Sequence, residues 1–227
     1  MTIPKFVVIG AARSGTTILN KVLMQSPDLN MYEDYEIFNR HYPSLDQKIF
    51  DFDISEFETD RFISDDQHNK ICWKKYCQKA HEYYDGFKLL TWHLKNDVEE
   101  YLNECKVVLI SRQNKLQVVA SHTVADMTDK WVGTDKFDGT IYLNPETTKL
   151  KIETIIKAEK KLLRYDPCIV YYEDSMQGNI DKICDFLGIP KYEIKYNIEK
   201  RIRKSMRNLI TNYNEVRQYD RELFVFN

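Results

Sequence analysis

A glycine-containing stretch near the start of the chain has the residue types of an anion-binding loop. Residues 10–17 read GAARSGTT; they follow the apolar run FVVI and lead into the helical pattern ILNKVLM. A loop that joins a strand to a helix directs the free N–H groups of the first helical turn, and the positive end of the helix dipole, at one point. Gly10 and Gly15 allow the backbone to approach closely, so the loop is suited to hold a phosphate or a similar anion.

The loop departs from that of nucleotide triphosphatases at one position. Their pattern GxxxxGK[ST] places a lysine on the β- and γ-phosphates and a hydroxyl on magnesium. Here the pattern is GxxxxGTT, with Thr16 in place of the lysine, Thr17 as a second hydroxyl and Arg13 as the nearest cation. The sequence therefore favours a metal-free, monophosphate-like group over magnesium triphosphate. The alternative is an ordinary turn between a strand and a helix.

A second candidate anion site lies at the end of a later strand. The stretch VVLISRQNKLQVVASH, residues 107–122, predicts a buried strand that ends at Arg112 and a helix that carries Ser121 two to three turns later. Taken alone, Arg112 is equally well interpreted as a strand-end residue of a salt bridge.

Short apolar runs that alternate with helical patterns predict the fold class. Continuous apolar runs of this length are typical of strands covered on both faces, hence of a parallel sheet. The recurring order of strand, loop and helix predicts an α/β fold: a three-layer, P-loop-like domain in which helices flank a central parallel sheet of about four to five strands. The clearest strands are residues 5–9, 86–90, 106–111 and 168–172.

Three further helices follow from apolar periodicity and end signals. Residues 64–84 carry one apolar stripe. Residues 144–165 begin with Asn144 as N-cap and a proline at the first helical position, and their stripe includes one acid, Glu159. Residues 179–190 end in GIP, which stops a helix.

The composition limits the class of protein. The chain has 227 residues, 43% of them hydrophobic, enough for one substantial core, and we expect one domain over residues 1–227. Lys and Arg number 33 and Asp and Glu 35, a formal charge of −2, so no nucleic-acid partner is expected. The first apolar run is too short for a signal peptide, and no stretch reaches the ~18 apolar residues of a membrane span. We therefore expect a cytoplasmic protein.

The five cysteines predict neither disulfides nor a metal site. Their number is odd, they are scattered, and Cys105 and Cys168 lie in or beside strand-like runs. This pattern is typical of reduced thiols in an intracellular protein. Cys72 and Cys77 are not followed by a second pair at zinc-ligand spacing, so no metal ion is expected.

Taken together, these motifs resemble the sulfotransferases that use 3′-phosphoadenosine-5′-phosphosulfate (PAPS). The resemblance rests on RSGTT, SRQNKLQVVASH, GFKLLTWHL, YYEDSMQGNIDKICDFLGIP and SMRNLITNYNEV. It is closest to carbohydrate sulfotransferases of the trehalose and nodulation-factor type, in which a serine follows the arginine by nine residues, as Ser121 follows Arg112. Only residues 39–82 and 123–150 lack the resemblance, and we expect these to be insertions on the acceptor side.

The resemblance implies PAPS as co-substrate, without a metal, and assigns its contacts. The loop would hold the 5′-phosphosulfate, with Arg13 on the sulfuryl oxygens, while Arg112 and Ser121 would hold the 3′-phosphate. Cations in residues 191–207 either reach the 3′-phosphate or form a solvated basic helix. The residues so implied are Arg13, Ser14, Gly15, Thr16, Thr17, Arg112, Ser121, Arg203 and Lys204.

The general base has two candidates. In the carbohydrate branch a glutamate lies just past the second strand, and EDYEIFN places Glu36 there, with Glu33 and Asp34 as competitors through a change of register. Other branches use a histidine, and KLLTWHL offers His93. A base must first satisfy geometry, so both remain open. With Arg13, Glu36 and His93 are the predicted catalytic residues.

The predicted function is transfer of a sulfuryl group from PAPS to a hydroxyl of a small-molecule or oligosaccharide acceptor, a carbohydrate or glycoconjugate. A P-loop small-molecule kinase is one alternative, although it would need a lysine where Thr16 stands. A non-catalytic nucleotide-binding protein of the same fold is another. Aromatic residues in the unmatched segments, among them Trp131 and Tyr142, are candidates to stack on sugar rings.

Overall fold

The fold is built on a parallel sheet. The computed structural model describes residues 3–32, 73–94, 96–131, 136–175, 177, 179–195 and 204–219. Within them, four strands form one sheet in the order β2-β1-β3-β4, and each neighbouring pair is parallel. The strands are β1 (Phe6–Gly10), β2 (Gly86–Leu90), β3 (Lys106–Ser111) and β4 (Cys168–Tyr171). The predicted α/β class and the central parallel sheet are confirmed.

The strands are apolar along their length because both faces of the sheet are covered. Every residue of β1 and β2 is buried. Successive side chains of a strand point to opposite faces. Accordingly, Val7 and Ile9 of β1 belong to one core cluster, and Phe6 and Val8 belong to another.

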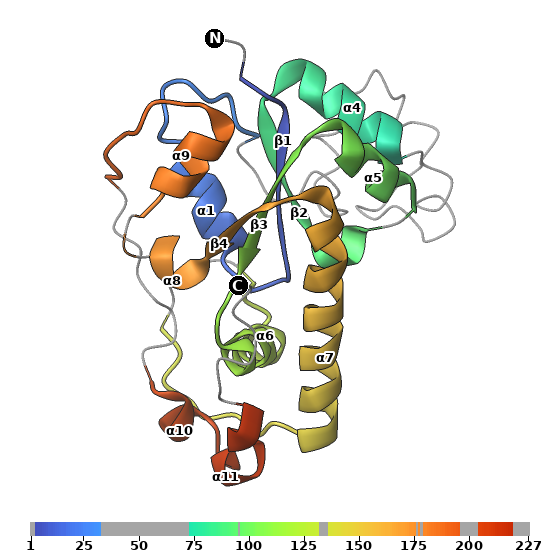
Figure 1. Ribbon diagram of the computed structural model, residues 1–227. Helices are drawn as coiled ribbons and strands as arrows, with labels where there is room; N and C mark the ends of the chain where they lie inside the picture. Colours follow the sequence, from blue (N-terminus) through green and yellow to red (C-terminus); the bar gives the residue numbers. More distant parts are fainter. Residues whose placement is uncertain are drawn as a thin grey trace, which may run out of the picture.

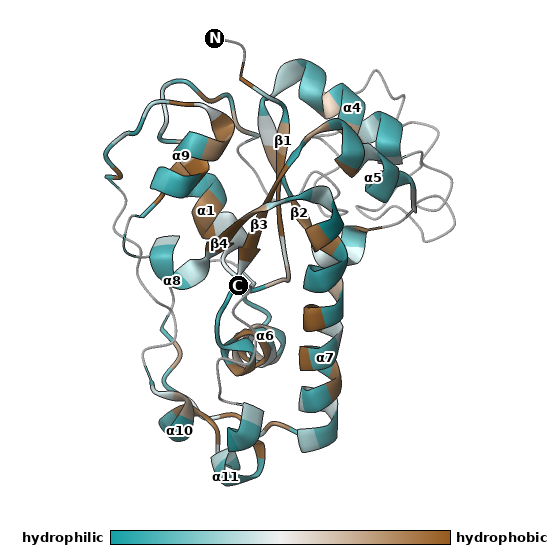
Figure 2. Cartoon of the chain, in the orientation of Figure 1, coloured by the Kyte–Doolittle hydropathy of each residue, from teal (hydrophilic) through white to brown (hydrophobic). Residues whose placement is uncertain are grey.

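Two pairs of helices form the outer layers. In Figure 1, α4 and α5 lie on one side of the strands and α1 and α9 on the other, in agreement with the two core clusters. Figure 2 shows brown, apolar strands between helices with teal, hydrophilic outer surfaces. The bounds of these helices are α1 (Thr16–Leu23), α4 (Trp73–Tyr83), α5 (Asn96–Tyr101) and α9 (Asp181–Leu187).

A further group of helices lies beyond the carboxyl ends of the strands (Figure 1). These helices share a third core cluster that includes Leu116, Ile152 and Leu209. A parallel bridge between Ile141 and Ile210 ties the segment before α7 to the segment after α10. The helices are α6 (Lys115–Thr128), α7 (Pro145–Leu162), α10 (Met206–Leu209) and α11 (Tyr213–Val216), while α8 (Tyr172–Ser175) directly follows β4.

The helix ends follow the signals in the sequence. The side chain of Asn144 accepts from the backbone N–H of Thr147 at 3.0 Å, which caps α7 as predicted. The helix predicted over residues 64–84 is present from Trp73, and its earlier part lies outside the described residues. Residues 73–82 of the expected insertion belong to α4, which packs on the sheet.

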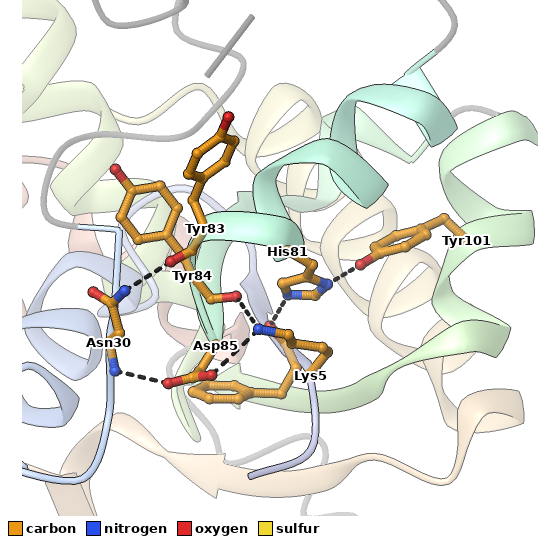
Figure 3. A network of polar contacts seen from close by, with 8 residues as sticks. Lys5, Asn30, His81, Tyr83, Tyr84, Asp85 and Tyr101 are labelled. Atoms are coloured by element: carbon orange, nitrogen blue, oxygen red, sulfur yellow. Dashed lines mark hydrogen bonds and ion pairs between the residues drawn. The ribbon is translucent and has the colours of Figure 1, made fainter. Parts of the chain in front are cut away.

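A polar network closes the amino ends of the strands (Figure 3). The ammonium of Lys5 donates to the carbonyl of Tyr84 at 2.8 Å and to Asp85 at 3.3 Å. Asp85 also accepts from the backbone N–H of Asn30 at 2.9 Å. Nearby, the buried His81 ring contacts the carbonyl of Phe6 at 3.0 Å. These bonds lie at the edge of the sheet formed by the amino ends of the strands. The loops that carry the candidate site residues lie at the opposite edge, formed by the carboxyl ends.

Candidate functional site

The loop between β1 and α1 has a conformation that depends on glycine. Arg13 and Gly15 have φ angles of 69° and 108°, both in the left-handed region. A Cβ atom at Gly10 would lie 2.5 Å from the carbonyl oxygen of Ile110, so no other residue fits there without displacement. The Ser14 side chain donates to the carbonyl of Ala11 at 2.7 Å and holds the turn closed.

The amino terminus of α1 follows this turn directly. Gly15 is its N-cap and provides no side-chain acceptor, so the amides of the first turn are not capped by a side chain. Thr16 is buried and Thr17 half-buried at the first two helical positions. These amides, together with the helix dipole, make the end of α1 favourable for an anion.

A buried lysine that the sequence did not single out reaches the same loop. Lys88 lies in the middle of β2 and is 1% exposed. Its ammonium donates to the Thr17 hydroxyl at 3.0 Å. The charged residue inside the apolar run GFKLL was the available signal, because a lysine within a strand buried on both faces needs a polar destination.

Arg13 joins the loop to helix α6. Its Nε donates to the Ser121 hydroxyl at 3.1 Å, and its Nη1 donates to the backbone carbonyl of Trp131. Ser121 is 7% exposed and lies on α6, the helix that follows Arg112. The structure thus brings together two residues that the sequence assigned to opposite ends of one nucleotide.

Arg112 has an aromatic partner in place of a carboxylate. Its guanidinium carbon lies 4.0 Å from the centroid of the Tyr172 ring, and no ion pair of Arg112 is present among the described residues. Its Nε is buried without a hydrogen-bond partner. Burial lowers the pKa of Arg112, while Tyr172 and Glu173 counteract that shift. A half-buried cation whose Nε has no partner is suited to bind an anion.

Tyr172 also contacts the anion-binding loop. A Cβ atom at Gly15 would lie 2.5 Å from Cδ2 of Tyr172, so the ring packs directly against this glycine. Tyr172 begins α8, directly after β4, and is 7% exposed. The sequence placed this tyrosine in the YYEDS stretch of the resemblance but gave it no role. The structure shows that one ring touches both candidate anion sites.

His93 lies just past the carboxyl end of β2, the strand that pairs with β1. Its Nδ1 lies 3.1 Å from the backbone N–H of Leu90, and its Nε2 lies 2.9 Å from the indole N–H of Trp92. A neutral imidazole accepts at one nitrogen only, so these two contacts are not hydrogen bonds at the same time. Leu90 is buried, whereas Trp92 is 56% exposed and free to bond with water.

Of the remaining predicted site residues, Lys204 lies in the part of the chain that the structure describes. Lys204 donates to the backbone carbonyls of Asp138 and Gly139, the latter at 3.1 Å. A contact between Lys204 and a phosphate would replace these bonds. Glu36, with its competitors Glu33 and Asp34, and Arg203 lie outside the described residues.

Among the described residues, no group of three or more His, Cys, Asp or Glu side chains is arranged to hold a metal ion. In the same part of the chain, no helix has both the length and the apolar character needed to cross a membrane.

Comparisons with known proteins agree with the fold. The model of the sulfotransferase family matches residues 4–193. Among solved structures, the chain is similar to a sulfotransferase from Alicyclobacillus acidocaldarius, with a TM-score of 0.51 and 13% sequence identity over 92% of this chain and 89% of that one. A search of curated proteins finds no significant match.

Proposed function

This chain belongs to the sulfotransferase family, and we propose that it transfers a sulfuryl group from PAPS to a hydroxyl group of a carbohydrate or glycoconjugate acceptor. One observation carries the proposal. Arg13 of the first loop hydrogen-bonds Ser121, and Tyr172 contacts both Gly15 of that loop and Arg112. The two candidate anion sites thus lie at the same edge of the sheet, which supports binding of a nucleotide with phosphates at its 3′ and 5′ positions.

PAPS would supply the sulfuryl group and leave as adenosine 3′,5′-bisphosphate. As the acceptor oxygen bonds to sulfur and the bond to the 5′-phosphate oxygen breaks, negative charge develops on that phosphate. The uncapped amides of α1, the Arg13 guanidinium and the Lys88 ammonium are the groups that would stabilise this charge. At the other end, the guanidinium of Arg112, whose Nε has no hydrogen-bond partner, would bind the 3′-phosphate beside Ser121.

The geometry at His93 bears on the choice of base. If the amide of Leu90 donates to Nδ1, the proton of the neutral ring lies on Nε2. In that tautomer Nε2 donates a hydrogen bond and does not accept a proton. This supports Glu36 as the base that takes the proton of the acceptor hydroxyl, with His93 as a hydrogen-bond donor near the sulfuryl group.

Exposed aromatic rings support a carbohydrate as the acceptor. Trp92 is 56% exposed beside His93, and Trp131 is 40% exposed with its carbonyl bonded to Arg13. The Trp131 ring also contacts His122, the neighbour of Ser121, with 5.0 Å between ring centroids. Aromatic faces next to the transfer site suit the apolar faces of a sugar ring.

Nucleotide binding tests the proposal. Adenosine 3′,5′-bisphosphate at about a hundred times its dissociation constant should stabilise the folded protein by about 2–3 kcal/mol in a thermal-shift assay. ATP with magnesium should have no comparable effect, and Arg112→Ala should abolish the stabilisation by the bisphosphate. Transfer of ³⁵S from labelled PAPS to an array of oligosaccharides would then identify the acceptor. Stabilisation by magnesium ATP, without any by the bisphosphate, contradicts the proposal.

A further inference from the structure

A buried ion pair lies directly behind Arg112. Lys115 is the first residue of α6, and Glu159 lies on α7; both side chains are 1% exposed. The Lys115 ammonium lies 2.9 Å and 2.7 Å from the two carboxylate oxygens of Glu159. The apolar stripe of α7 therefore carries its one acid toward this lysine.

The same ammonium holds the end of β3. It donates to the Ser111 hydroxyl at 2.6 Å and to the backbone carbonyl of Arg112 at 2.8 Å. With the bond to Glu159, these contacts use all three N–H donors of the lysine. The side chain of Asn114 accepts from the amides of Leu116 and Gln117 and caps the helix that begins there. The turn between β3 and α6 is thus held by hydrogen bonds between the side chains of Lys115 and Asn114 and its backbone groups.

Stability alone does not account for a charge pair at this depth. Removing two charges from water costs several kcal/mol per ion, and well-packed apolar residues in the same space often give equal or greater stability. Burial raises the pKa of Glu159, and its bonds with Lys115 and Ser111 counteract that shift. What an apolar pair could not supply is a donor for the Arg112 carbonyl.

We propose that Lys115 and Glu159 are positioning residues, which fix the backbone of Arg112 so that its guanidinium, stacked on Tyr172, binds the 3′-phosphate of the nucleotide. Glu159 acts through Lys115, since it orients the ammonium and neutralises its charge. This inference rests on the proposed function, because it assigns the 3′-phosphate to Arg112. It extends the binding site to helix α7, which in the described structure contributes no group to the loop.

Two nucleotides that differ only in the 3′-phosphate provide the test. Dissociation constants for adenosine 3′,5′-bisphosphate and adenosine 5′-monophosphate, measured by calorimetry, give a selectivity ratio for that phosphate. Lys115→Met should reduce the ratio by about tenfold or more, the scale of a charge-assisted hydrogen bond, while affinity for the monophosphate stays nearly unchanged. Glu159→Gln should reduce it in the same direction.

A double variant distinguishes a loss of positioning from a failure to fold. Lys115→Met/Glu159→Leu replaces the pair with apolar side chains of similar volume, which proteins commonly tolerate. It should fold and should also lose selectivity. Glu99→Gln is the matched control, because Glu99 is 8% exposed and pairs with Lys161 of α7, away from Arg112. It should keep the wild-type ratio.

The outcomes separate this inference from the proposed function. A folded double variant with the wild-type ratio overturns the positioning role, and so does an equal loss of selectivity in Glu99→Gln. If the wild-type protein does not distinguish the two nucleotides, or if Arg112→Ala leaves the ratio unchanged, the proposed function itself fails.

Discussion

At the scale of single residues, the candidate site contains three cations in three environments. Arg13 bonds a hydroxyl and a carbonyl of another segment, Lys88 is buried within a strand, and Arg112 stacks on an aromatic ring. Arginine offers a planar fork with several donors, whereas lysine acts as a compact point charge. The two arginines are therefore suited to bind polyoxyanions through several donors. Lys88 is suited to hold the Thr17 hydroxyl and to place one positive charge at the start of α1.

The assignment of the base gives a prediction about two substitutions. If Glu36 takes the proton, Glu36→Gln should lower kcat by about 10²–10⁴-fold, the usual contribution of a general base. His93→Gln should keep most of the activity because glutamine retains an N–H donor, and His93→Ala should lose more. Single-turnover transfer of ³⁵S from PAPS, followed across pH, measures these effects. The assignment is contradicted if His93→Gln is as inactive as Glu36→Gln. It is also contradicted if the activity of His93→Gln no longer falls at low pH as that of the wild-type enzyme does.

Only part of this site could be predicted from the residues themselves. Arg13 and Arg112 follow the carboxyl ends of β1 and β3, and parallel strands place these ends at the same edge of the sheet. Lys88 and Tyr172 could not be assigned to the site from the sequence. Lys88 lies inside a strand and Tyr172 directly after one, so their contacts with the loop depend on which strands are neighbours in the sheet. The Lys115–Glu159 pair depends on how α7 packs against α6, which periodicity does not specify.

At the scale of elements, the turn before α1 is the part most constrained by sterics. Gly15 has a φ angle of 108° and lies against the Tyr172 ring, so a side chain there meets both backbone strain and a clash. Gly188, which ends α9, has a φ angle of 71° but no atom within 4 Å of an added Cβ. A substitution at Gly188 therefore tests backbone strain alone, whereas a substitution at Gly15 tests strain together with the contact to Tyr172.

Alanine at these two positions should therefore act differently. Gly15→Ala combines left-handed strain with overpacking and should lower the free energy of unfolding by about 2–5 kcal/mol. It should also weaken binding of adenosine 3′,5′-bisphosphate, because Tyr172 must move. Gly188→Ala should cost only about 1–2 kcal/mol and leave binding intact. Denaturant unfolding and calorimetry measure both quantities, and unchanged nucleotide affinity in folded Gly15→Ala contradicts the role given to this turn.

The elements themselves were the most predictable feature. All four predicted strands are present within one residue of their predicted bounds, because strands buried on both faces leave an uninterrupted apolar run. Helix α7 begins at Pro145 as its cap predicts. Residues 132–135 have no comparable pattern in the sequence and lie outside the described residues.

At the scale of the whole molecule, the two edges of the sheet have different roles. The carboxyl edge carries the candidate anion sites, and the amino edge carries the network of Lys5, Asp85, Asn30 and His81 (Figure 3). The order β2-β1-β3-β4 places β1 between β2 and β3. Lys88 lies within β2, His93 follows β2, and Arg112 follows β3. That order could not be predicted from the strands alone, because an apolar run does not specify its neighbours.

The amino edge gives the protein a specific dependence of stability on pH. His81 is buried between the Phe6 carbonyl and the Tyr101 hydroxyl, and burial lowers its pKa to about 4. The unfolded chain, with an ordinary histidine pKa of about 6.5, binds more protons between these two values. Neutral His81 thus contributes stability above about pH 6.5, and this contribution, up to about 3 kcal/mol, is lost as pH falls toward 4.

Urea unfolding of His81→Gln tests this dependence. The free energy of unfolding of the variant should change less with pH across this interval than that of the wild-type protein, since glutamine does not titrate. Parallel profiles for the two proteins would place the acid sensitivity elsewhere in the molecule.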